Sequence, residues 1–275
     1  AAKYSQKLKD KKLDNFQSNL ISAVYFLENK DFKNASFYLK KLEDKNQPGT
    51  IQNLLSTSLN AWINFRNISN LSPALSLLDA IPERFKEIKK IQKTFAHCYF
   101  DSQDVDKIFK QLTSNRDISY SRYHFFHANY LISKNKVKAT KEVIKSALDQ
   151  FPRNLILNQL KLDLKTKQTF NNEFDCKNPA DVIAEIFYVA SSALASQNNY
   201  IASNFYLNLA KHLNPNFVSY NTLHANNLYF NQEYVKAKNI YIEIKKKGAA
   251  YNWHASKQIA SIFIKQNKKK KNNKQ

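Results

Sequence analysis

The sequence predicts an all-α protein organised as an α-solenoid, in which antiparallel helix pairs stack on one another. Residues of the second half recur at an interval of 34: Leu194, Tyr200 and Ser203 return as Leu228, Tyr234 and Ala237. A repeat of this length is typical of stacked two-helix units. The 275-residue chain is 43% hydrophobic and has 2 glycines and 6 prolines, which argues against a disordered or turn-rich protein.

Residues 1–166 are predicted to hold about four helix pairs and a lone helix. A lysine-rich leader over 1–15 becomes helical where apolar residues begin to recur. Helical faces of the first three pairs are marked by apolar residues three and four apart: Leu20, Ala23, Val24 and Leu27 with Phe32, Ala35, Leu39 and Leu42; Ile51, Leu55, Leu59 and Trp62 with Leu71, Ala74, Leu78 and Ile81; Ile88, Ile91, Phe95 and Tyr99 with Val105, Ile108 and Leu112.

The fourth pair shares the register of the later repeats. Its positions Val137, Thr140, Ile144, Ala147 and Pro152 each lie 63 residues before Tyr200, Ser203, Leu207, Ala210 and Pro215. An extra segment therefore interrupts the array, which we interpret as a lone helix over 155–166 and a linker over 167–179. Residues 180–266 then hold two repeats and a final helix from Tyr251 to about Gln266, and 267–275 are predicted to form a disordered basic tail.

The formal charge of +21 predicts attraction to polyanions such as nucleic acid or acidic membranes. Only five of the 43 basic residues are arginines, however, and Arg is the residue that recognises phosphate through two parallel hydrogen bonds. Abundant Lys, Asn and Ile are also expected of an AT-rich genome. The charge therefore has two explanations, biased composition and a functional basic surface.

Neither a disulfide nor a metal site is expected. Cys98 and Cys176 lie far apart and form no metal-binding spacing. His124 and His127 share a predicted helical face, but no third ligand is near, so both are interpreted as ordinary histidines, and no cofactor is expected. No apolar run approaches the ~20 residues of a membrane helix, so no transmembrane segment is predicted. The Ala1-Ala2 start without Met fits a removed signal peptide and export, or equally a trimmed chain from the cytoplasm.

The repeats resemble the tetratricopeptide repeat family. In the unit ending at Pro215, the family's large, small and aromatic positions fall on Phe187, Ser191, Leu194, Tyr200, Ser203, Leu207 and Ala210, and in the next on Ala225, Leu228, Tyr234, Ala237, Tyr241 and Ile244. That second unit departs from the pattern at Asn221 and Ala249. The likeness is strong over 120–152 and 180–244, and the layout looks like bacterial, particularly alphaproteobacterial, members. Small residues at Ala23, Ala128, Ser191 and Ala225 are predicted contact points between helices.

The resemblance implies that the first helices of successive pairs line a concave groove. Its side chains would be Arg122, Phe125 and Asn129; Glu185, Tyr188 and Ser192; Thr222, Asn226 and Tyr229; and Trp253 as a further aromatic anchor. Asn129 and Asn226 fall where chaperone-binding members grip a peptide's terminal carboxylate. The lysine pattern that accompanies such a clamp is not recognisable, so a general peptide groove is favoured.

We therefore expect a non-enzymatic scaffold that binds a protein or peptide. No nucleophile and base pattern occurs, and two glycines, Gly49 and Gly248, do not make a phosphate-binding loop. One alternative is RNA binding, because 218–223 with 243–248 is similar to a pentatricopeptide unit. Another is a membrane-surface adaptor that uses the basic ends. The partner's identity and the oligomeric state are left open.

Overall fold

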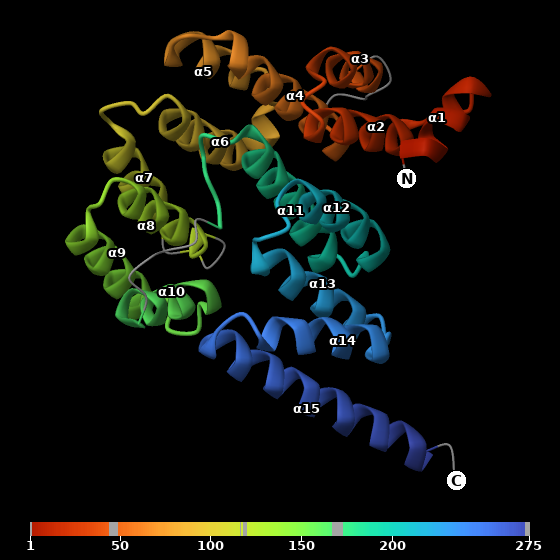
Figure 1. The fold of residues 1–275 in the computed structure, drawn as a ribbon, viewed down its shortest axis with the longest axis vertical. Helices are drawn as coiled ribbons and strands as arrows, with labels where there is room; N and C mark the ends of the chain where they lie inside the picture. The colour runs from red at the N-terminus through yellow and green to blue at the C-terminus, as the bar shows by residue number, and fades with distance from the viewer. Residues whose placement is uncertain (1, 44–48, 116, 118–119, 167–172, 273–275) are drawn as a thin grey trace. The chain divides into compact units, whose positions relative to one another are not determined.

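The computed structural model describes residues 2–43, 49–115, 117, 120–166 and 173–272. All regular elements in this described part are helices, which confirms the predicted all-α class (Figure 1). The chain forms two units. Unit 1 consists of residues 1–112, 175–190 and 208–214, and unit 2 of residues 113–174, 191–207 and 215–275.

Unit 1 begins with a succession of helices, α1 to α6, each packed on the next. α1 packs on α2, α2 on α3, α3 on α4, α4 on α5 and α5 on α6. A contact of 2.6 Å between Glu28 Oε2 and His212 Nε2 joins α2 to the last turn of α12. The helices span Ala2–Asp10 (α1), Phe16–Glu28 (α2), Phe32–Glu43 (α3), Ile51–Asn64 (α4), Leu71–Asp79 (α5), Lys86–Tyr99 (α6) and Val105–Thr113 (α7), with short 3-10 turns at Phe65–Asn67 and Glu83–Phe85.

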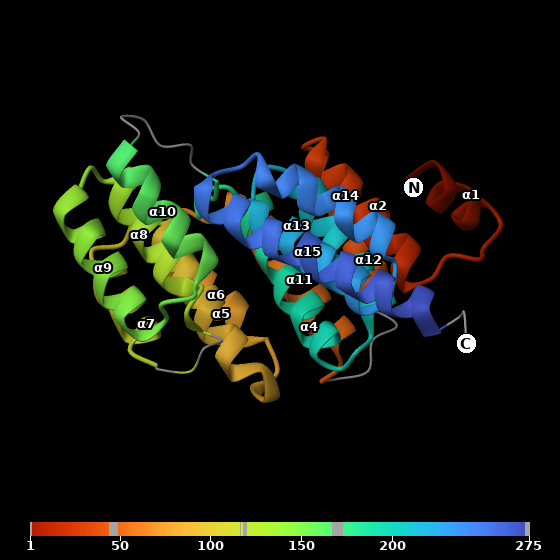
Figure 2. The same ribbon diagram turned by 90° about the horizontal axis from the view of Figure 1, so that it is seen from below.

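Unit 2 contains α8 packed on α9, α9 on α10, α13 on α14, and α14 on α15. α10 also packs on α15, and α14 and α15 lie side by side in both views (Figures 1 and 2). These helices span Tyr123–Ser133 (α8), Val137–Gln150 (α9), Leu155–Thr166 (α10), Val218–Phe230 (α13), Tyr234–Lys245 (α14) and Ala249–Asn272 (α15). α11 (Pro179–Ser196) and α12 (Tyr200–Leu213) contribute residues to both units.

Local sequence explains where these helices begin. Asn15 and Ser18 form a capping box at the start of α2, and Thr50 accepts a hydrogen bond of 3.2 Å from the backbone of Asn53 at the start of α4. Pro179 is the first residue of α11, where proline is tolerated because its position needs no N–H donor. α15 ends at Asn272, beyond the predicted end near Gln266. Residues 167–172 of the predicted linker and 273–275 of the predicted tail lie outside the described residues.

The small residues predicted as helix contact points are fully buried: Ala23, Ala128, Ser191 and Ala225. At one of them the chain uses hydrogen bonds as well as a short side chain. Ser203 Oγ of α12 donates to the backbone oxygen of Ser191 at 2.8 Å, and Asn227 Nδ2 of α13 donates to Ser203 Oγ at 2.8 Å. Buried polar atoms are stable only when paired in this way, so these bonds specify how the three helices meet.

Six turns between neighbouring helices in the described part of the chain share one geometry. Each has a residue with positive φ whose N–H bonds the carbonyl three residues earlier, while the next N–H bonds a carbonyl five residues before it, the Schellman arrangement. The positive-φ residues are Lys12, Lys30, Asp101, Asn135, Asn198 and Gln232. Successive intervals from Asp101 onward are 34, 63 and 34 residues, so the register of the clear repeats extends back to the α6–α7 pair.

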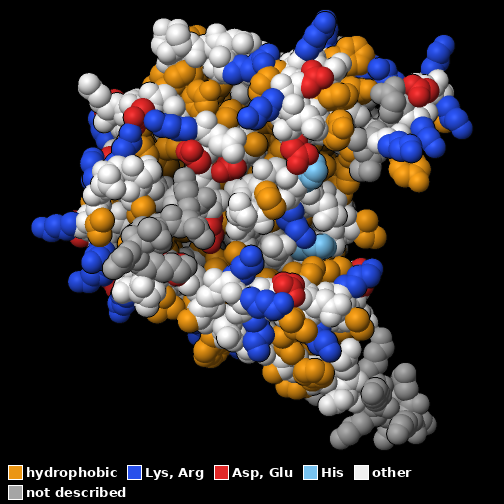
Figure 3. Space-filling model, viewed as in Figure 1, with side chains coloured by type: hydrophobic (Ala, Val, Ile, Leu, Met, Phe, Trp, Pro, Cys, Tyr) orange, Lys and Arg blue, Asp and Glu red, His pale blue; other side chains and the backbone are white. Residues whose placement is uncertain are grey.

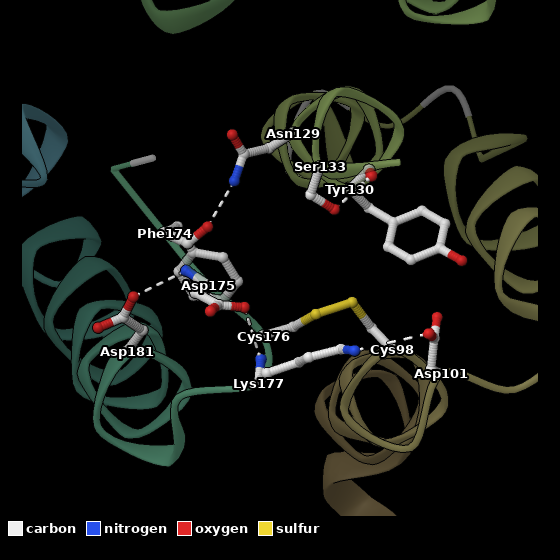
Figure 4. The surroundings of a disulfide bond; sticks show 10 residues. All are labelled: Cys98, Asp101, Asn129, Tyr130, Ser133, Phe174, Asp175, Cys176, Lys177 and Asp181. Carbon is white, nitrogen blue, oxygen red and sulfur yellow. Dashed lines mark hydrogen bonds and ion pairs between the residues drawn. A yellow bond between two sulfur atoms is a disulfide. The ribbon is translucent and has the colours of Figure 1, made fainter. Parts of the chain in front are cut away.

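A disulfide joins Cys98 to Cys176, and the sequence-based expectation that none would form was wrong. Cys98 lies in the last turn of α6, and Cys176 lies three residues before the start of α11 within the same unit; their Cα atoms are 5.9 Å apart. The 78-residue separation hid this pairing, because the chain returns to unit 1 only at residue 175. Lys177 pairs with Asp101 at 3.5 Å beside the bond (Figure 4).

Candidate functional site

Two of the predicted groove residues belong to the core of unit 2. Arg122 is 9% exposed and Phe125 is 4% exposed. Arg122 Nη1 donates to Ser219 Oγ at 2.5 Å, and its guanidinium lies 4.7 Å from the centre of the Phe217 ring. Phe125 stacks on the same ring at 5.5 Å. The start of α13 covers this face of α8, so neither side chain is accessible to a ligand in the structure.

Asn129, one turn further along α8, is half-buried and also engaged within unit 2. Its Nδ2 donates to the backbone oxygen of Phe174 (Figure 4). A clamp that grips a carboxylate needs this amide as a donor to the ligand. Because Asn129 already donates to the chain itself, it is a poorer clamp residue than its counterpart Asn226.

The predicted residues of α11 differ in exposure. Glu185 is buried, Tyr188 is half-buried and Ser192 is exposed. Glu185 and Tyr188 belong to unit 1, whereas Ser192 belongs to unit 2. Tyr188 and Ser192 therefore remain predicted contact residues, each within its own unit.

α13 carries the best-formed part of the predicted site. Thr222, Asn226 and Tyr229 are all half-buried, and their spacing of four and three places them on one face of the helix. Thr222 Oγ1 donates to the backbone oxygen of Val218 at 3.3 Å. The Tyr229 ring packs edge-on against Tyr234 at 5.7 Å. This face is thus partly covered, and it presents a polar amide beside an aromatic ring.

Asn226 has a fixed orientation. The Tyr241 hydroxyl donates to Asn226 Oδ1 at 2.5 Å. Burial raises the pKa of Tyr241, so the hydroxyl keeps its proton and must act as the donor. Among the described residues, none accepts a hydrogen bond from Asn226 Nδ2. The amide nitrogen is therefore the group that a ligand can use.

Trp253 is 68% exposed on α15, whose opposite face buries Tyr251, Ala255 and Ile262. Lys257 Nζ lies 5.7 Å from the centre of the Trp253 ring. The exposed ring leaves the aromatic-anchor role of Trp253 a prediction.

The sequence reasoning missed a set of exposed apolar residues at the turns of unit 2. Ile201 is 80% exposed and Val235 is 66% exposed, and they occupy equivalent places 34 residues apart. Phe230, also exposed, stacks on Tyr200 at 6.0 Å. The signal was present in the sequence, because Ile201 and Val235 directly follow the repeated Tyr200 and Tyr234.

In the part of the chain that the structure describes, no group of three His, Cys, Asp or Glu side chains could hold a metal ion. His124 is buried with its Nε2 unpaired among the described residues, and burial lowers its pKa to about 4. None of the described helices is both long enough and apolar enough to span a bilayer. No protein-family model matches the sequence, and no characterised protein is significantly similar to it.

Proposed function

We propose that this protein is a non-enzymatic scaffold whose stacked, tetratricopeptide-like helix pairs bind an extended peptide or protein segment. Support comes from the recurring turn geometry at 34-residue intervals and from the buried small residues at the repeat positions. Both are expected when one supersecondary unit is used repeatedly.

The observation that carries the proposal is the oriented amide of Asn226. An amide nitrogen held in place by Tyr241 can donate to a peptide carbonyl without losing conformational freedom on binding. Tyr229, one turn along the same face, offers an aromatic surface for a side chain of the peptide. Thr222 extends this face toward the start of α13.

A displayed random-peptide library tests this proposal. Peptides selected on the oxidised protein are measured by fluorescence polarisation against single variants. Asn226→Ala and Tyr229→Ala are expected to weaken binding about tenfold or more. Asn226→Asp keeps the oxygen that Tyr241 needs but removes the donor, so it should weaken binding as much as alanine does.

The matched control is Asn252→Ala, which removes an exposed asparagine from α15. Equal affinity of the wild type and all three site variants would exclude this face of α13 as the binding surface. Single-stranded RNA is measured in the same assay to test the alternative that the partner is RNA. An affinity for RNA that falls steeply with salt concentration and depends on Asn226 and Tyr229 would favour that alternative. Co-sedimentation with acidic vesicles covers the membrane-surface alternative.

The disulfide supports a location for this function. Such bonds persist in oxidising compartments and are rare in the cytosol. We infer that the protein works in an oxidising compartment, where nucleic acid is a less natural partner than protein. Alkylation of free thiols in intact cells, followed by denaturation and mass analysis, tests this inference: labelled Cys98 and Cys176 would contradict it.

A further inference from the structure

Lysine and arginine side chains are spread over the face shown in Figure 3, so positive charge alone marks no particular site. One place in unit 1 combines charge with shape. A hollow of about 330 Å³ lies between α6 and α7. It is lined by Glu83, Lys86, Lys89, Lys90, Lys93, Thr94, His97, Ile108 and Gln111.

The lysines belong to one stretch of α6. Residues 86, 89, 90 and 93 are three, four and seven apart, so their side chains share one face of the helix. The stretch covers about 10 Å along the helix axis at the usual rise per residue. Ile108 and Gln111 of α7 supply an apolar and a polar group on the opposing side.

Two of these lysines are held in place by the chain. Lys93 Nζ pairs with Asp79 Oδ1 at 2.5 Å, and Lys89 Nζ donates to the backbone oxygen of Asp79 at 3.3 Å. Lys89 also lies 3.5 Å from Glu83 Oε2, and its side chain is 17% exposed. Their position is therefore fixed before any ligand arrives, which reduces the entropy cost of binding.

The other two lysines are uncompensated. Lys86 and Lys90 are exposed, and neither forms an ion pair with any described residue. Glu83 is the carboxylate in the lining, and His97 adds no positive charge near neutral pH because burial lowers its pKa. The lining therefore carries excess positive charge, which an anionic ligand would neutralise.

We propose that the hollow between α6 and α7 binds a small ligand that carries two or more adjacent phosphate groups. Its volume lies at the lower end of ligand sites and suits a small molecule or a lipid headgroup. Lysine binds phosphate as a point charge, without the planar geometry that arginine needs. An extended acidic peptide spreads its charges at about 3.3–3.6 Å per residue and would leave most of them outside the hollow, whereas linked phosphates concentrate theirs within it.

Inorganic tripolyphosphate is the soluble probe, measured by calorimetry at physiological ionic strength. Lys86→Ser combined with Lys90→Ser should weaken its binding about tenfold, since each exposed charge pair contributes a few-fold. The matched control combines Lys141→Ser with Lys145→Ser, which removes two exposed lysines, also four apart, from α9. The control is expected to change the affinity less than twofold.

A second arm uses phosphatidylcholine vesicles with and without a phosphorylated inositol lipid. The phosphates would be assigned to a lipid headgroup by two results together: the wild type does not bind tripolyphosphate, and the double variant Lys86→Ser with Lys90→Ser loses vesicle binding while the control variant keeps it. Equal losses in the two double variants, or no binding of either probe, would overturn the proposal. If citrate displaced bound tripolyphosphate as effectively as tripolyphosphate itself does, the inference that the hollow prefers phosphate groups to other anions would be overturned. None of these outcomes depends on peptide binding at α13.

Discussion

Breaking the Cys98–Cys176 bond should destabilise the protein by an amount that follows from the loop it closes. The bond spans 78 residues. The chain-entropy relation gives about 15 cal/mol/K for a loop of this length, or about 4.5 kcal/mol at 25 °C, while measured disulfides typically contribute about 2–4 kcal/mol. We therefore expect a loss of about 3 kcal/mol. With a urea slope of about 3 kcal/mol/M, the unfolding midpoint should fall by about 1 M.

The assay is urea unfolding followed by circular dichroism, with the wild type oxidised or treated with a phosphine reductant. The double variant Cys98→Ala with Cys176→Ala should have the same unfolding midpoint as the reduced wild type, and adding the reductant should not change that midpoint. A midpoint that is the same in oxidised and reduced wild type would refute the reasoning. So would alkylation of both cysteines in protein that was purified and denatured without reductant.

Three further perturbations have signs fixed by the structure. His124 has a pKa of about 4 in the folded state, compared with 6.5 for an unperturbed histidine, so the free energy of unfolding should decrease by up to about 3 kcal/mol as pH falls from 6.5 to 4. In His124→Phe the free energy of unfolding should depend less on pH over this range, and an unchanged pH dependence would contradict the assignment. Asp181 has its pKa raised to about 6, chiefly by burial, so its contribution is present below pH 4 and lost as pH rises through 6; because both of its oxygens accept hydrogen bonds, from the Asp175 N–H and from Asn178 Nδ2, Asp181→Asn should destabilise the protein at pH 4 and do so less at pH 8, where it also removes the cost of a buried charge, whereas an equal effect at both values would exclude titration as the cause. Gly248 has φ +153, and a Cβ there would collide with the Gln159 amide that accepts from the Ala250 N–H; Gly248→Ala should cost about 2–3 kcal/mol, and a double-mutant cycle with Gln159→Ala should show coupling between the two sites rather than additivity.

The helix positions followed from the sequence because apolar spacing and caps are local properties. Asn15, Thr50 and Pro179 stand at helix starts, and each acts through residues within one turn of itself. The Schellman geometry that the turns share was not anticipated, since its positive-φ residues are polar rather than glycine.

The disulfide and the burial of Arg122 and Phe125 depend on contacts between distant segments. Cys98 meets Cys176 only because the chain re-enters unit 1 after residue 174. The repeat register assigned Arg122 and Phe125 to an open helix face. The register alone does not predict that Phe217 covers that face. By contrast, the α13 residues predicted from the same register are partly exposed. The peptide-binding role itself stays a prediction.

The recurring turn also offers a graded way to adjust stability. A residue other than glycine in the left-handed region carries a cost of about 1–2 kcal/mol, which is smaller for Asn and Asp than for Lys or Gln. Lys30 and Gln232 therefore bear more conformational strain than Asn135 or Asn198. Since each turn is closed by hydrogen bonds within its own hairpin, relief at one leaves the others unaffected. Glycine introduced at Lys30 would test this relief most directly, because at Asp101 and Asn198 it would also remove the ion pair with Lys177 and the hydrogen bond from the Tyr200 hydroxyl.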